Sequence, residues 1–208
     1  MIAVVDYNTG NVGSVLNMLK KVGAKAVISR DPDVLRAADK LILPGVGAFD
    51  EALANLHRFG LYDVLNELVI EMHRPILGIC LGAQIMARSS DEGVRPGLGW
   101  LNARIVRFQA PEQQVLRVPH MGWNRVQPEA VGGGIFMGVP QPMRFYFVHS
   151  YHMVVDEPSL ELASSDYGSR FTSAMGRGNI LSMQFHPEKS HKYGIQVFRN
   201  FVESFESC

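Results

Sequence analysis

The stretch Arg74-Pro75-Ile76-Leu77-Gly78-Ile79-Cys80-Leu81-Gly82-Ala83-Gln84 decides the fold of this chain. Its proline ends the preceding helix, and residues 76–79 form a short apolar run typical of a buried strand. Cys80 follows directly, between two glycines. Residues 83–87 predict the first turns of a helix. Strand, tight turn and helix with Gly-x-Cys-x-Gly at the turn indicate a nucleophile elbow, where glycines let the chain turn sharply and the middle residue projects its reactive atom.

Cys80 has two interpretations at this point. In the first it is a nucleophile, because a helix N-terminus favours the reactive thiolate form of a cysteine placed there. In the second it is a buried cysteine that acts as a small apolar residue, which is common for unpaired cysteines. The choice depends on whether the rest of the chain supplies a base and an oxyanion site.

Composition limits the class of protein. The chain has 208 residues, of which 47% are hydrophobic, so we expect one domain over residues 1–208 with a substantial core. Twenty basic residues balance twenty acidic ones without a basic run, so nucleic acid is not an expected partner. The two cysteines, Cys80 and Cys208, predict no disulfide framework and a reducing cytoplasm. The N-terminus lacks a basic start and reaches Asp6 early, which argues against a signal peptide or membrane segment.

Strands and helices alternate in the first half of the chain. The expected strands are residues 2–5, 26–28, 41–43 and 76–79, and the expected helices are residues 12–22, 32–38, a region from Asp50, and 61–72. Alternating buried strands and helices imply a parallel sheet with helices on both faces. The ligand crevice of such a sheet lies beyond the carboxyl ends of its strands. The expected glycine-rich loop at residues 44–47 and the elbow at Cys80 share that edge.

The second half changes to short strands. We expect them at residues 103–108, 115–118, 145–148, 160–163, 171–175 and 180–185, with turns at residues 132–134 and 176–179. The second turn predicts a hairpin, and a closing helix starts near Lys192. The predicted fold is therefore three-layer α/β, a mostly parallel sheet with an antiparallel extension.

A candidate base follows the strand predicted at residues 180–185. The sequence there is His186-Pro187-Glu188, and proline biases the residue before it to extended geometry. Side chains two apart on an extended segment point the same way, so Glu188 can reach one ring nitrogen of His186. A carboxylate in that place orients a general base and stabilises the imidazolium. The alternative, a plain surface turn, is less favourable once Cys80 lies at a neighbouring strand end.

Acyl transfer also needs donors for the developing oxyanion. The backbone N–H of Leu81 follows the nucleophile directly, and Val46 lies in the flexible glycine-rich loop. The alternatives for that loop are a plain turn and a phosphate loop. No Gly-Lys-Ser/Thr follows, so a Walker pattern is absent.

With these parts assembled, the chain resembles the class I (triad) glutamine amidotransferases. The motifs that carry this resemblance are residues 78–84 and His186-Pro187-Glu188. Further segments are similar to the glutaminase subunits of imidazole glycerol phosphate synthases: residues 6–11, 44–49, 119–124, 147–152 and 185–190. Many members carry a second glycine near position 8 and a bulkier residue at position 83, so the chain departs from the pattern there. The resemblance implies a flavodoxin-like sheet.

The resemblance also implies a reaction and its residues. The Cys80 thiolate attacks the side-chain amide of glutamine while His186, oriented by Glu188, moves protons. An N–H of Val46 or Gly47 joins Leu81 at the oxyanion. The residues expected to bind glutamine are Gly45, Gly82, Gln84, Glu92, His149, Ser150 and Tyr151. No cofactor and no metal are expected.

Ammonia must stay neutral to act as a nucleophile, which implies a channel into a partner. The resembled enzymes pair with a (β/α)8-barrel cyclase, as a heterodimer that makes imidazole glycerol phosphate and an aminoimidazole ribotide. The residues expected to face that partner are Asn11, Trp123, Tyr146 and Lys189, although Trp123 fits a core position as well.

Three other functions remain open from the sequence. A paralogous glutaminase could feed ammonia to another synthetase, such as one that amidates a bacterial surface sugar. A cysteine hydrolase or peptidase would need no partner. A non-catalytic binding protein would have no use for Cys80, His186 and Glu188 together.

Overall fold

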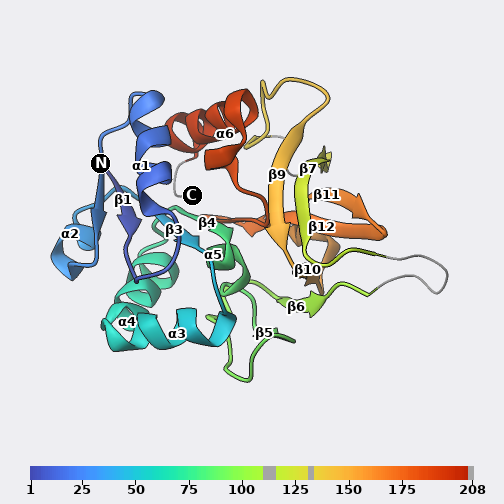
Figure 1. The fold of residues 1–208 in the computed structure, drawn as a ribbon. Coiled ribbons are helices and arrows are strands. Elements are labelled where there is room, and N and C mark those ends of the chain that lie inside the picture. The colour runs from blue at the N-terminus through green and yellow to red at the C-terminus, as the bar shows by residue number, and fades with distance from the viewer. Residues whose placement is uncertain (110–115, 131–133, 206–208) are drawn as a thin grey trace.

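The computed structural model describes residues 1–109, 116–130 and 134–205 (Figure 1). Its centre is five parallel strands, in the spatial order β2 (Ala26–Ser29), β1 (Ile2–Val5), β3 (Lys40–Gly45), β4 (Ile76–Cys80) and β13 (Ile180–Met183). This is the flavodoxin-type order, in which the strand path reverses between β1 and β3. The predicted mostly parallel sheet is confirmed.

Helices cover both faces of the sheet because the apolar strands present side chains alternately to each face. Ile2 and Val4 pack in one core cluster and Ala3 and Val5 in the other. The first cluster is closed by α1 (Val12–Lys21) and α6 (His191–Ser204), and the second by α2 (Pro32–Arg36), α3 (Phe49–Arg58) and α4 (Leu61–Asn66). The three layers are visible in Figure 1. In the described part of the chain, no helix has the length and apolar character to cross a membrane.

The sheet continues beyond β13 as the expected antiparallel extension. Its strands are, in spatial order, β12 (Ser169–Arg177), β10 (Tyr151–Val155), β6 (Ala103–Arg107) and β5 (Ser89–Ser90), and β11 (Glu161–Tyr167) joins β12 to β8 (Gln127–Pro128). The turn between β12 and β13 is the predicted hairpin. A separate two-stranded sheet pairs β7 (His120–Arg125) with β9 (Arg144–His149), and it stands beside the extension in Figure 1.

The prediction of a strand at residues 115–118 is wrong for residues 116–118, the part that the structure describes. Residues 116–118 are irregular and the strand β7 starts at His120 instead. Pro119 explains the difference, since proline has no N–H for a strand ladder. Residue 115 and most of the turn expected at residues 132–134 lie outside the described residues.

Three element boundaries also differ from the prediction. Pro44 and Gly45, expected in a loop, remain in β3, where Gly45 pairs with Cys80. The helix expected over residues 61–72 is α4 followed by a π-helical turn, η1 (Glu67–Glu71). The helix after the elbow, α5, is the single turn Leu81–Gln84 rather than residues 83–87. The spacing of the apolar residues predicted that each element exists, but not the residues at which its backbone hydrogen bonds begin and end.

Candidate active site

Cys80 occupies a sharp elbow at the end of β4. Its φ is 54° and its ψ is −111°, a conformation that non-glycine residues rarely adopt. The glycines on either side make this elbow possible, because they have no side chain where other parts of the chain come very close. A Cβ on Gly82 would lie 1.8 Å from the carbonyl oxygen of Leu43, and one on Gly78 would lie 2.8 Å from Cα of Ala83. The elbow therefore needs glycine at both positions.

His186 and Glu188 form a buried pair at the end of the neighbouring strand. Nδ1 of His186 lies 2.7 Å from Oε1 of Glu188, and each side chain is only 2% exposed. The short 3₁₀ turn η4 (Pro187–Lys189) carries the glutamate back beneath the ring. The His186 backbone N–H donates to the carbonyl of Tyr146 at 2.9 Å, and the Ser190 hydroxyl donates to the carbonyl of His186 at 2.6 Å. The imidazole is thus fixed through its ring and its backbone.

The electrostatic surroundings favour the protonated form of His186. Burial lowers the pKa of the imidazole, but the interactions with the Cys80 sulfur and the Glu188 carboxylate outweigh it and raise the pKa to about 9. Nε2 of the ring is buried and forms no hydrogen bond to any described residue, although Cys80 is close enough to contribute to the shift. Transfer of the Sγ proton to Nε2 is therefore favourable, because the resulting imidazolium lies beside both the sulfur and the Glu188 carboxylate.

A cavity of about 400 Å³ opens beside Cys80, large enough for a small metabolite. It brings together most of the predicted site residues; its lining is Val46, Gly47, Cys80, Leu81, Gln84, Glu92, Pro119, Val148, His149, Ser150 and Tyr151. Sequence analysis did not single out Pro119 and Val148. Gly45 and Gly82 lie behind the wall, where a Cβ on Gly45 would come within 2.6 Å of the Gly82 nitrogen. These two glycines let strand and elbow pack together and do not contact the cavity.

Glu92 reaches the cavity from the loop after β5. Its Oε2 accepts a hydrogen bond from the backbone N–H of Phe49 at 3.0 Å, at the start of α3. Burial raises the pKa of this carboxyl group, the bond from Phe49 opposes that change, and Asp50 adds to it. Oε1 forms no hydrogen bond to the described residues. One carboxylate oxygen thus anchors the loop and the other faces the cavity.

His149 belongs to a buried chain of hydrogen bonds. Its Nδ1 lies 2.7 Å from the carbonyl oxygen of Tyr151, which can only accept, so the proton is on Nδ1. Nε2 then accepts from Nδ1 of His120 at 2.9 Å. Burial lowers the pKa of His149 to about 3 and that of His120 to about 4, so both rings are neutral. His120 was missed because only the register of β7 on β9 places it opposite His149.

Gln184 is a second residue near Cys80 that sequence analysis did not single out. It is fully buried, and its Nε2 faces Sγ of Cys80 at 4.0 Å. One signal in the sequence could have identified it: Gln184 lies two residues before His186 on an extended segment, so the two side chains point the same way.

Three of the four predicted partner-facing residues gather on one surface. Trp123 and Tyr146 are cross-strand neighbours on β7 and β9, with ring centroids 6.4 Å apart, and Nζ of Lys189 lies 5.7 Å from the Tyr146 centroid. Trp123 is 40% exposed and stacks on His191 at 5.6 Å, so it is not a core residue. We call Trp123, Tyr146, Lys189 and His191 the aromatic face.

Asn11 has a structural partner of its own. Its Oδ1 accepts from the backbone N–H of Ser14 at 3.2 Å and so caps the N-terminus of α1. The helix contacts η4, which carries Lys189, so Asn11 begins an element that packs beside the aromatic face.

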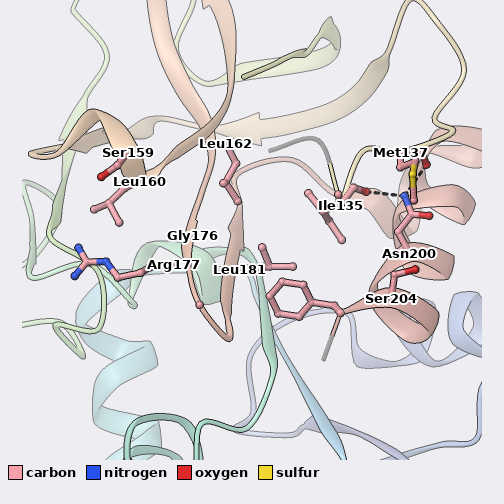
Figure 2. A pocket seen from close by; sticks show the side chains of 13 residues that line it. Ile135, Met137, Ser159, Leu160, Leu162, Gly176, Arg177, Leu181, Asn200 and Ser204 are labelled. Atoms are coloured by element: carbon pink, nitrogen blue, oxygen red, sulfur yellow. Dashed lines mark hydrogen bonds between the residues drawn. The ribbon is translucent and has the colours of Figure 1, made fainter. Parts of the chain in front are cut away.

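A larger cavity of about 530 Å³ lies elsewhere, between the β12–β13 hairpin, the start of β11 and the end of α6 (Figure 2). Its walls are mainly apolar, with Ile135, Leu162 and Leu181 turned toward its centre. The described residues that line it include no histidine and no carboxylate, and Arg177 is paired with Glu157 at 3.2 Å. It offers no acid–base chemistry, so the smaller cavity at Cys80 is the candidate active site.

The chain is similar to known proteins over nearly its whole length. Residues 3–205 match the family model described as Glutamine amidotransferase class-I. The chain is 51% identical to the Pseudomonas aeruginosa protein named imidazole glycerol phosphate synthase subunit HisH 2, over 98% of this chain and 99% of that one. It is 44% identical to a protein of the same name from Methanococcus maripaludis, with the same coverage. A Thermoplasma acidophilum protein described as a GMP synthase subunit superposes with a TM-score of 0.71 at 26% identity, over 97% of this chain and 91% of that one.

Proposed function

This chain belongs to the class-I glutamine amidotransferase family, and from that premise we propose that it is the glutaminase subunit of an imidazole glycerol phosphate synthase in histidine biosynthesis. One observation carries the proposal: Cys80, which interacts with the buried His186–Glu188 pair, opens on a cavity lined by five of the seven predicted glutamine-binding residues. The similarity to subunits of that name over nearly the whole chain supports the same function and one catalytic domain over residues 1–208. The reducing cytoplasm suits this chemistry, since the thiol must stay unoxidised.

The first half of the reaction forms a thioester. The Sγ proton moves to Nε2 of His186, and the sulfur attacks the side-chain amide carbon of glutamine. The carbonyl oxygen becomes an oxyanion that accepts hydrogen bonds from the backbone N–H of Leu81 and from that of Val46 or Gly47. As the intermediate collapses, the carbon–nitrogen bond breaks, and the imidazolium gives its proton to the leaving nitrogen, which departs as ammonia.

The second half returns the enzyme to its starting state. Water attacks the thioester carbon while His186 accepts one of its protons, the carbon–sulfur bond breaks, and glutamate leaves. The proton on His186 returns to Sγ. Glu188 stabilises the imidazolium in both halves.

Different residues of the cavity wall bind different groups of glutamine. The free oxygen of Glu92 suits the α-ammonium group, and Gln84 and Ser150 offer hydrogen bonds to the polar ends of the substrate. Both ring nitrogens of His149 are used inside the protein, so His149 acts by holding the backbone of Tyr151 in place.

The released ammonia needs a closed route, because water would protonate it. We place the cyclase partner, a (β/α)8 barrel in a heterodimer with this chain, on the aromatic face and the adjacent start of α1 at Asn11. An exposed tryptophan and a tyrosine on one surface have the composition of an interface centre, and the neighbouring lysine suits its polar rim.

A second candidate function has the same glutaminase chemistry. In this alternative the chain is a paralogous subunit, and its ammonia serves another synthetase.

A coupled assay tests the proposal. The purified chain is assayed for glutamine hydrolysis alone and with a histidine-pathway cyclase, and the pair is then assayed for imidazole glycerol phosphate. We expect hydrolysis to rise with the cyclase and the product to form. Cys80→Ala should abolish glutamine-dependent synthesis and leave synthesis from free ammonium salts. Hydrolysis without product would favour the second candidate, whereas loss of both activities in Cys80→Ala would make Cys80 structural.

A further inference from the structure

The orientation of Gln84 follows from one backbone carbonyl. A single atom of its side-chain amide lies 3.0 Å from the carbonyl oxygen of Tyr151 and 3.0 Å from the amide of Gln184. A carbonyl oxygen can only accept, so this atom is Nε2, which carries two hydrogens. Its second hydrogen is therefore directed at Gln184.

That bond fixes the orientation of Gln184 in turn. The atom that faces Gln84 must be an acceptor and is Oε1, so the NH₂ group of Gln184 is on the other side, facing Sγ of Cys80 at 4.0 Å. Gln184 has no exposed surface, and its backbone N–H is held by the carbonyl of Ser173 at 2.9 Å. A neutral donor is thus fixed beside the nucleophile.

The other polar neighbour of Sγ has the opposite character. The carbonyl oxygen of Val148 lies 3.9 Å from Sγ and can accept a hydrogen bond from the thiol, but it repels a thiolate. Once the Sγ proton has moved to His186, the N–H of Gln184 is a neutral side-chain donor that faces the sulfur alongside the His186 imidazolium. A donor in a dry site acts more strongly on an ion than on a neutral group.

We propose that Gln184 is a catalytic residue that stabilises the Cys80 thiolate, held in its donor orientation by Gln84. The inference rests on the proposed thiol chemistry of Cys80 and adds a residue to it. It also connects substrate recognition to the nucleophile, because Gln84 lines the cavity and its Oε1 forms no hydrogen bond to the described residues. A substrate N–H on that oxygen would polarise the Gln84 amide and strengthen the chain of donors toward Sγ.

The matched test is Gln184→Glu. Glutamate keeps the length of the side chain and the oxygen that accepts from Gln84, and it replaces only the donor that faces Sγ. Gln184→Met removes both polar atoms at similar volume. Gln127→Met, at an exposed position on β8, is the control substitution.

The readout is the rate of alkylation of Cys80 by iodoacetamide as a function of pH, with the modified residue identified by peptide mapping. We expect Gln184→Met to react about 10-fold more slowly at pH 7, with the midpoint of the pH profile higher by about one unit, and Gln184→Glu to react more slowly still. The turnover number for glutamine should fall in parallel with little change in KM. Gln84→Met should raise KM, because Gln84 lines the cavity, and should also slow the alkylation of Cys80, because it removes the group that orients Gln184. A purely structural glutamine would leave the pH midpoint unchanged.

Two outcomes overturn the inference. A wild-type profile in variants that melt cooperatively would refute the role of Gln184 while leaving the proposed function intact. A wild-type Cys80 that iodoacetamide does not modify faster than a free cysteine peptide would refute both. If Gln184→Glu does not fold, as judged by its thermal transition, Gln184→Met decides.

Discussion

The protonation of His186 is set by competing neighbours. Burial alone would keep the ring neutral, but the Cys80 sulfur and the Glu188 carboxylate together raise its pKa to about 9. An imidazole that binds the thiol proton readily generates the nucleophile, and one that holds it too firmly gives it up slowly to the leaving nitrogen. Glu188 therefore influences both halves of the reaction.

Glu188→Gln tests how far a single negative charge controls the protonation of His186. The amide keeps the shape of the side chain but removes the negative charge beside Nδ1, so the pKa of His186 should fall from about 9. We expect the turnover number for glutamine to drop by about 100-fold or more, since orientation and charge are both affected. The turnover number measured as a function of pH reports both changes. Glu51→Gln, at an exposed position on α3, is the control. An unchanged profile would contradict the role of Glu188.

The elbow formed by β4 and α5 needs glycine because glycine has no side chain, and not only because its backbone is free to turn. A methyl group on Gly82 would meet the backbone oxygen of Leu43, which is fixed inside β3 and cannot move aside as a flexible side chain could. The sequence showed that a turn was present, but only the approach of β3 to α5 shows why the second glycine is required.

Gly82→Ala should therefore destabilise the protein by about 3 kcal/mol, measured as the free energy of unfolding in urea. Gly13→Ala is the matched control. Gly13 lies in α1 with no atom near the site of its missing methyl group, so alanine there should stabilise the protein by about 0.5 kcal/mol. Equal effects of the two substitutions would show that the contact with Leu43 does not matter.

The strand that carries Cys80 was predictable because its apolar run is continuous, and the strand before His186 because its run is mainly apolar and ends before a proline. β5, β7, β8 and β10 were not predicted. β5 and β8 are two residues long, β7 starts beyond the strand expected at residues 115–118, and β10, Tyr151–Val155, falls in a segment whose motif indicates binding rather than a strand. The same limit applies within the site. Spacing joined His186 to Glu188, but the contacts His120–His149 and Gln184–Cys80 depend on strand register and tertiary packing.

On the scale of the whole molecule, the aromatic face should contribute much of the affinity for the cyclase. Trp123 is held between His191 and Tyr146, so little side-chain entropy is lost on binding. Trp123→Ala should weaken the complex by about 2 kcal/mol, or about 30-fold in Kd by calorimetry, without lowering the thermal midpoint of the free chain. Met72→Ala, at an exposed apolar residue after η1, is the control. Equal losses in the two variants would place the partner elsewhere.

The buried histidines also predict how the stability of the whole molecule depends on pH. The pKa values of His120 and His149 are lowered to about 4 and about 3, so the folded protein does not bind the protons that these groups bind when unfolded. Their contribution is complete above the ordinary value of about 6.5 and is lost as the pH falls toward 4. The pKa of His186 is raised to about 9, so its contribution is complete below 6.5 and is lost as the pH rises through 9.

Together these groups place the maximum of the unfolding free energy near pH 6.5, with a decline on both sides. Urea unfolding from pH 4 to pH 10 measures it, and we expect the alkaline decline to be on the order of 2 kcal/mol. Glu188→Gln should shrink the alkaline decline and leave the acid side unchanged, because the charge that it removes acts on His186 and not on the neutral pair. An alkaline decline of the same size in this variant would mean that Cys80 alone raises the pKa of His186.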